Sequence, residues 1–152
     1  MEWTYDGKPV TDADLDGYVA LVYLIRCTKN GKWYLGKKRL IKKTSKNPLK
    51  GKKRKRIIYS ESDWRSYYGS SDELKKDLVE MGEEHFTREV LVFCKTLGAS
   101  SYVEAKCQFI TDCILDKKSY NVWISCRSRA EHLKGIDHEK ITKGINRLLS
   151  LV

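Results

Sequence analysis

Residues 18–40 read YVALVYLIRCTKNGKWYLGKKRL, and this stretch carries the strongest signals of secondary structure in the chain. Its first part, residues 18–27, is apolar on both faces and rich in β-branched and aromatic side chains, which is typical of a central strand covered on two sides. Asn30-Gly31 follows as the strongest short signal for a β-hairpin. Residues 32–40 are therefore predicted to return as an antiparallel strand.

Alternation of side chains in this hairpin places two tyrosines together. Tyr23 and Tyr34 share one face of the sheet because side chains alternate with a period of two, and a shift of the pairing by two residues keeps this parity. Gly36 and Lys38 fall on the same face, and the glycine leaves space beside them. The spacing alone leaves open whether the two rings form a site or are ordinary core aromatics.

The remaining pattern predicts two helices on a small sheet, followed by a tail. A helix is expected over 72–81, a third strand over 86–94 and a second helix over 101–115. Residues 119–124 are short and extended, and residues 127–151 form an amphipathic helical tail. Strands that precede and alternate with helices in this way predict an α+β fold, with a small antiparallel sheet of about three strands flanked by helices.

Length and composition limit the class of protein. The chain has 152 residues, of which 41% are apolar and 33% charged, as in a soluble globular domain. No apolar run approaches the roughly 20 residues that span a bilayer, and the acidic, polar N-terminus is not a signal peptide. The five cysteines contain no CxxC pair, so we expect free thiols and an intracellular protein.

Positive charge is concentrated in one segment. Of the 30 basic residues, 12 lie in residues 37–56, which hold no acidic residue, so the other 18 face 20 acidic residues and give a net charge of −2. Asn47-Pro48 and Gly51 predict a loop here. Such a segment favours a polyanion with salt-dependent affinity, and a solvated loop or a nuclear-import signal is the alternative. The expected nucleic-acid contacts are Lys37, Arg39, Lys42, Lys43, Lys52, Lys53, Arg54, Lys55 and Arg56.

Several motifs together resemble one enzyme family. Leu21-Val22-Tyr23, ten further residues and then Tyr34-Leu35-Gly36 resemble the signature of the GIY-YIG endonucleases, with leucine and valine in place of the first glycine and isoleucine. Glu104 matches the glutamate of the family's helix, and Asn121 matches the asparagine at the end of the module. Residues 64–71 resemble a segment of phage Seg-type members, and the resemblance covers residues 18–124.

The resemblance implies a role for each matching residue. Glu104 is expected to hold one Mg²⁺ or Mn²⁺, which neutralises charge on the phosphate and helps the leaving oxygen. Ser101-x-x-Glu104 is also a capping box, in which the glutamate only closes a helix start. Tyr23 and Tyr34 are expected to position or deprotonate the attacking water. A tyrosine acting as base needs a nearby cation, because its ordinary pKa is about 10, and Lys38 is the candidate.

Two further roles complete the expected site. The family's arginine would clamp phosphate oxygens with its forked guanidinium, and either Arg65 or Arg39 can fill this position, with Arg65 preferred because it precedes the 72–81 helix. Asn121 is expected to hold the site together by side-chain hydrogen bonds, although a turn asparagine is the plainer interpretation. The expected catalytic set is Tyr23, Tyr34, Lys38, Arg65, Glu104 and Asn121.

These inferences predict a metal-dependent DNA endonuclease with double-stranded DNA as its partner and no membrane association. Residues 1–17 form an N-terminal extension, 18–124 the nuclease domain with its basic insertion at 37–56, and 125–152 a helical tail. The chain is short for a large DNA-reading module, which leaves the insertion, the tail, a partner or a homodimer on DNA to select the target. A phage origin would place it in the cytoplasm of an infected bacterial host. The alternatives are an inactive nucleic-acid-binding protein on the same scaffold and an RNA-binding basic protein.

Overall fold

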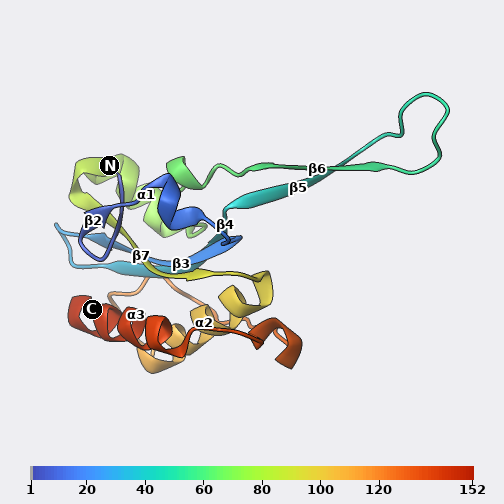
Figure 1. Ribbon diagram of the computed structural model, residues 1–152. Helices are drawn as coiled ribbons and strands as arrows, with labels where there is room; N and C mark the ends of the chain where they lie inside the picture. Colours follow the sequence, from blue (N-terminus) through green and yellow to red (C-terminus); the bar gives the residue numbers. More distant parts are fainter. Residues whose placement is uncertain (1) are drawn as a thin grey trace.

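The computed structural model describes residues 2–152 and shows three layers built around a central sheet (Figure 1). The five strands of this sheet follow the order β2-β1-β7-β3-β4. Buried apolar side chains fill both sides of the sheet in two separate clusters. The strands are β1 (Trp3–Tyr5), β2 (Lys8–Pro9), β3 (Ala20–Cys27), β4 (Trp33–Arg39) and β7 (Phe86–Cys94).

The predicted α+β class is correct, but the sheet is larger than three strands and is not wholly antiparallel. Strand β1 pairs in parallel with β7 and carries β2 as a short antiparallel neighbour. Trp3 is buried against the ring of Tyr23, with centroids 5.3 Å apart. The residues of the predicted N-terminal extension therefore extend the sheet; Met1 lies outside the described residues.

The hairpin of β3 and β4 keeps the predicted parity with a different register. Tyr23 lies opposite Gly36 and Ile25 lies opposite Tyr34, two residues away from a turn centred on Asn30-Gly31. The Cys27 amide donates to the carbonyl of Lys32 at 2.8 Å, so the loop holds four residues instead of two. Because the shift is by two, Tyr23 and Tyr34 still share a face.

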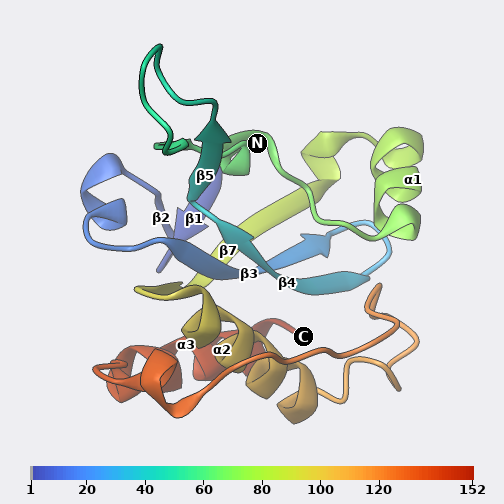
Figure 2. The same cartoon turned by 90° about the vertical axis from the view of Figure 1, so that its right-hand side faces the viewer.

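The helices cover opposite faces of the sheet (Figure 2). Helix α1 (Asp72–Met81) matches the predicted range, and Ser71 Oγ accepts from the Leu74 amide as its N-cap. Helix α2 (Leu97–Ile110) and helix α3 (His138–Leu151) pack on the other face.

Two predicted helix ranges need correction. Helix α2 begins four residues earlier than expected because Thr96 Oγ1, not Ser101, accepts a hydrogen bond from the first turn, at 3.0 Å from the Ala99 amide. The tail is helical over residues 138–151 and otherwise contains one short 3₁₀ turn, Ala130–Leu133. Asp137 caps α3, accepting from the Lys140 amide at 3.0 Å.

The basic insertion is a loop only over its middle part, residues 47–55, which contains Asn47-Pro48 and Gly51. Strands β5 (Ile41–Lys46) and β6 (Arg56–Glu61) pair in antiparallel and form a separate two-stranded sheet. This β5–β6 arm projects away from the body, with residues 47–55 as its tip (Figure 1). Ile41, Ile57, Ile58 and Tyr59 supply the β-branched and aromatic side chains that favour strands, and the high charge concealed this preference.

Two further findings concern membrane-spanning helices and the state of the cysteines. In the described part of the chain, residues 2–152, no helix is long and apolar enough to cross a membrane. All five cysteines carry free thiols; Cys126 is exposed and the other four are buried.

Candidate active site

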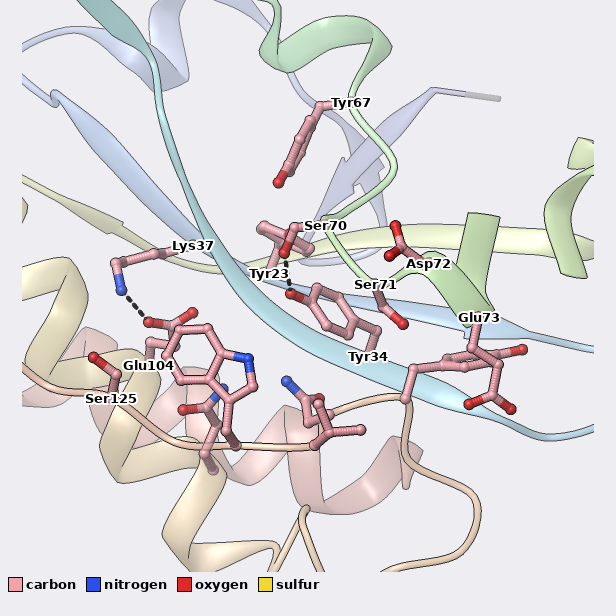
Figure 3. A pocket seen from close by; sticks show the side chains of 15 residues that line it. Tyr23, Tyr34, Lys37, Tyr67, Ser70, Ser71, Asp72, Glu73, Glu104 and Ser125 are labelled. Carbon is pink, nitrogen blue, oxygen red and sulfur yellow. Dashed lines mark hydrogen bonds and ion pairs between the residues drawn. The ribbon is translucent and has the colours of Figure 1, made fainter. Parts of the chain in front are cut away.

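A cavity of about 520 Å³ opens at the β4 edge of the sheet (Figure 3). Four of its lining residues come from distant parts of the sequence: Tyr23 from β3, Tyr34 from β4, Glu104 from α2, and Asn121 from the segment after it. Loop residues Tyr67, Ser70 and Ser71 close the side next to α1. The fold therefore brings together four of the six expected catalytic residues.

Gly36 allows Tyr23 to reach this edge. A Cβ atom at position 36 would lie 2.6 Å from Tyr23 Cζ and 2.9 Å from Tyr34 Cε1, which is closer than real Cβ contacts allow. The strand pairing of β3 with β7 is also irregular at Val22 and Tyr23. Such bulges re-aim side chains beside active sites. The glycine and the bulge together explain how a tyrosine only 1% exposed still lines the cavity.

The two tyrosines are neutral phenols in the free protein. Their ring centroids are 6.2 Å apart, and Tyr67 packs edge-on against Tyr23 at the same separation. Burial raises the pKa of Tyr23 well above its ordinary value, and the neighbouring Tyr34, Tyr67 and Glu104 act in the same direction. Burial also raises the pKa of Tyr34, although its hydrogen bond to Ser70, 2.9 Å between oxygens, opposes the rise.

Glu104 projects from the middle of α2 into the cavity and forms an ion pair with Lys37 of β4. Burial raises the pKa of Glu104, whereas the ammonium of Lys37 lowers it. The capping-box alternative is wrong, because the helix begins at Leu97 and the Ser101 hydroxyl donates to the Leu97 carbonyl instead. Glu104 therefore has no part in starting its helix. The residue is 9% exposed and faces the cavity.

Asn121 holds the segment after α2 against the edge of β4. Its Oδ1 accepts from the Leu35 amide at 2.9 Å, and its Nδ2 donates to the Leu35 carbonyl at 2.8 Å. One side chain thus satisfies both backbone groups of a buried edge residue, as a paired strand would. Immediately before it, the Tyr120 amide donates to the Trp33 carbonyl at 2.8 Å. This clamp fixes one wall of the cavity relative to Tyr34.

Neither of the two expected catalytic cations, Arg65 and Lys38, lines the cavity. Arg65 lies outside the cavity lining, held by Asp12 and Glu61 at 2.6 and 2.8 Å. Lys38 forms an ion pair with Asp63 at 2.8 Å, and its ammonium lies over the ring of Tyr67, 3.6 Å from the centroid. The lysine beside the carboxylate of Glu104 is Lys37, which sequence analysis treated only as a nucleic-acid contact.

Strand alternation carried the signal for this missed role. Adjacent residues of β4 point to opposite faces, so Lys38 shares the face of the tyrosines while Lys37 points to the face that α2 covers. The pairing of Lys37 with Glu104 depends on the packing of α2 against β4, which no motif of the sequence shows.

A second groove, of about 540 Å³, runs from the cavity to the root of the β5–β6 arm. Lys37 lines both the cavity and this groove. Arg39 lies in the groove and not in the cavity. The basic residues of the groove are Lys37, Lys38, Arg39, Lys42 and Lys43.

Of the three carboxylates that line the cavity, Asp72 and Glu73 are exposed and Glu104 is buried. Within residues 2–152, no three His, Cys, Asp or Glu side chains are grouped so as to hold a metal ion by themselves. Mg²⁺ nevertheless binds through one or two carboxylates together with water and substrate phosphate oxygens. The buried, cavity-facing carboxylate of Glu104, already paired with a cation, fits such a site.

Comparison with known families agrees with this arrangement. A family model described as "Putative endonuclease segE, GIY-YIG domain" matches residues 3–124. The chain therefore belongs to the GIY-YIG endonuclease family, and to its Seg type. This membership supports nuclease activity in general. Searches among curated proteins and among solved structures gave no match.

Proposed function

We propose that the protein is a metal-dependent endonuclease that hydrolyses phosphodiester bonds of double-stranded DNA. The observation that carries this proposal is the meeting of Tyr23, Tyr34, Glu104 and Asn121, from four separate elements, in one cavity. Hydrolysis of a phosphodiester needs an oriented water, neutralisation of charge on the phosphate and help for the leaving oxygen.

Glu104 would hold the divalent ion, Mg²⁺ or Mn²⁺, in a single-metal site. When bound, the ion would polarise the phosphate and stabilise the leaving oxygen. Lys37, as the cation that lines both the cavity and the basic groove, would contact the phosphate oxygens in the role that sequence comparison gave to Arg65.

The tyrosines would orient the attacking water. As neutral phenols, Tyr23 and Tyr34 can donate and accept hydrogen bonds. For Tyr23 to accept a proton from the water, positive charge must counter the effect of burial on its pKa. Lys37, which pairs with Glu104 in the cavity, would supply that charge, and Asn121 would keep the wall in place through Leu35.

The altered first motif is compatible with activity. Leu21 and Val22 replace a glycine and an isoleucine, and both are 0% exposed. Leu21 packs in the cluster on the α1 side and Val22 in the cluster on the α2 side. These residues fill core positions, while Tyr23, the member of the motif with a hydroxyl to offer, lines the cavity.

Cleavage of supercoiled plasmid DNA tests the proposal. We expect the protein to nick or cut with Mg²⁺ or Mn²⁺ and to stop in EDTA. Glu104→Gln should lower the cleavage rate by about a thousandfold, which corresponds to about 4 kcal/mol of transition-state stabilisation. DNA binding of this variant, measured by fluorescence anisotropy, should remain within about threefold.

Glu139→Gln, an exposed carboxylate on α3, is the matched control and should cut at the normal rate. Normal cleavage by Glu104→Gln would refute the site assignment. Binding of DNA without cleavage in either metal would instead support the inactive scaffold, and preference for RNA would support the third alternative.

A further inference from the structure

The β5–β6 arm is bare on both of its faces. Its strand residues are exposed except Thr44 and Ile58, which form one cross-strand pair and are half-buried. Figure 1 shows the arm extending into solvent away from the three layers. A two-stranded hairpin alone is marginally stable in water, so a ribbon of this kind gains most from a partner that covers it.

The two faces of the arm differ in charge. Cross-strand pairing separates the twelve strand residues into two alternating sets. The face called here the cationic face has three cations and no anion: Lys42, Thr44, Lys46, Arg56, Ile58 and Ser60. The opposite face, the mixed face, has one cation and one anion: Ile41, Lys43, Ser45, Ile57, Tyr59 and Glu61.

We propose that the cationic face of the arm lies in the major groove of duplex DNA and contacts base edges there. This inference rests on the proposed function and deepens it, because it names the groove and the residues that read it. Charge complementarity selects the face: the cationic face carries a net +3 and the mixed face is neutral. The tip adds Lys50, Lys52, Lys53, Arg54 and Lys55.

Dimensions select the groove. Two paired strands lie about 4.8 Å apart, and six residues of strand extend about 20 Å. The major groove, about 12 Å wide, admits a two-stranded ribbon, whereas the minor groove, about 6 Å wide, does not. Phosphates on both walls would then lie within reach of the long side chains of Lys42, Lys46 and Arg56.

The centre of the cationic face has side chains suited to bases. Thr44 and Ser60 bring hydroxyls that can donate or accept hydrogen bonds, and Ile58 offers an aliphatic surface to a thymine methyl group. Towards the body, the basic groove continues from Lys42 to Lys37 at the cavity. A duplex held by the arm would therefore reach the cavity at a fixed distance from the bases being read.

A matched pair of variants tests the face. Lys46→Gln and Lys43→Gln remove the same charge from opposite faces of one strand. Binding of the full chain to a mixed-sequence 40-base-pair duplex is measured in EDTA by fluorescence anisotropy across a salt series. Lys46→Gln should weaken binding severalfold and reduce the slope of log K against log salt by about 0.9. Lys43→Gln, on the mixed face but beside the basic groove, should have a clearly smaller effect on both. Equal losses, or no loss for Lys46→Gln, would overturn the assignment.

A second pair of measurements tests the groove. Methylation of guanine N7, which lies in the major groove, should weaken binding, whereas netropsin bound in the minor groove of an A·T tract in the same duplex should not compete. The reverse pattern, or equal affinity for single-stranded DNA, would refute the inference. Binding is measured without metal, so the two proposals can fail separately. A protein that binds in this way but never cuts would refute only the proposed nuclease activity. A protein that binds and cuts equally well when the cations of the cationic face are removed would refute only this inference.

Discussion

Tyr23, Glu104 and Asn121 of the cavity are buried and held by their neighbours, whereas nearly all strand residues of the β5–β6 arm are exposed. Tyr34 is bonded to Ser70, Glu104 to Lys37 and Asn121 to Leu35. Reacting groups must be held in near-attack geometry, which needs a packed setting. Neutralising a row of phosphates needs charge density and reach, which a bare ribbon supplies. Damage to the cavity should therefore reduce the rate of cleavage, and damage to the arm should reduce the affinity for DNA.

After the loss of Glu104, the largest expected effect comes from filling the space beside Gly36. Gly36→Ala places a methyl group 2.6 Å from Tyr23 Cζ, so both tyrosines must move. A misplacement of about 1 Å can cost about a hundredfold in rate, and we expect at least that loss in single-turnover cleavage with unchanged DNA affinity. Gly135→Ala is the control, because it strains a backbone with φ of +70° but its Cβ meets nothing within 4 Å. Cleavage by Gly36→Ala at the normal rate would remove the tyrosine geometry from the mechanism.

A smaller effect is expected from the tip of the arm, and it should fall on DNA affinity and not on the cleavage rate. Changing Lys52, Lys53, Arg54 and Lys55 to glutamine removes four cations without touching the cavity. Affinity at about 150 mM salt should fall by tenfold or more, with a shallower salt dependence. Single-turnover cleavage at saturating protein should stay within about twofold. A slower rate at saturation, with affinity unchanged, would show that the tip belongs to the catalytic machinery and would break the division between the two regions.

The sequence predicted the parts of the molecule that follow from local pattern. Alternation in the hairpin placed Tyr23 and Tyr34 on one face, and the even-numbered shift of the register left this unaffected. Helix α1 was found because its cap, Ser71, and its apolar stripe agree. Glu104 and Asn121 were assigned to the site only through family resemblance. No local pattern in the sequence shows that α2 approaches β4.

The features that were missed depend on tertiary packing or were concealed by charge. Strand β1 has only three residues and is stabilised by parallel pairing with β7. Its register partners lie 85 residues later in the sequence, as Arg88 does for Trp3. The whole basic segment was predicted as a loop from Asn47-Pro48 and Gly51, which lie in the tip of the arm, while its high charge concealed the β-branched residues on either side. Arg65 seemed suited to phosphate, yet Asp12 of the N-terminal segment binds its guanidinium at 2.6 Å, a contact that no local pattern contains.

The smallest expected effect is on folding stability, which the buried carboxylate of Glu104 should lower at neutral pH. Because burial raises the pKa of Glu104, the unfolded chain releases this proton at a lower pH, near the ordinary value of about 4.3, than the folded protein does. Stability attributable to Glu104 therefore falls as the pH rises from that value through the folded pKa, and the loss is complete above it. Glutamine cannot ionise, and Lys37 is partly exposed and can be hydrated when unpaired.

Glu104→Gln should consequently melt at a higher temperature than the parent at pH 7, and the difference should vanish near pH 4. Each kcal/mol corresponds to about 2–4 °C for a chain of this size. Differential scanning calorimetry across this pH range measures the effect, with Glu139→Gln on α3 as the exposed control that should show no such trend. A melting temperature that falls below the parent as pH rises would mean that the Lys37 ion pair outweighs desolvation. In that case Glu104 would contribute to stability, and the cavity would not carry the stability cost that distinguishes it from the arm.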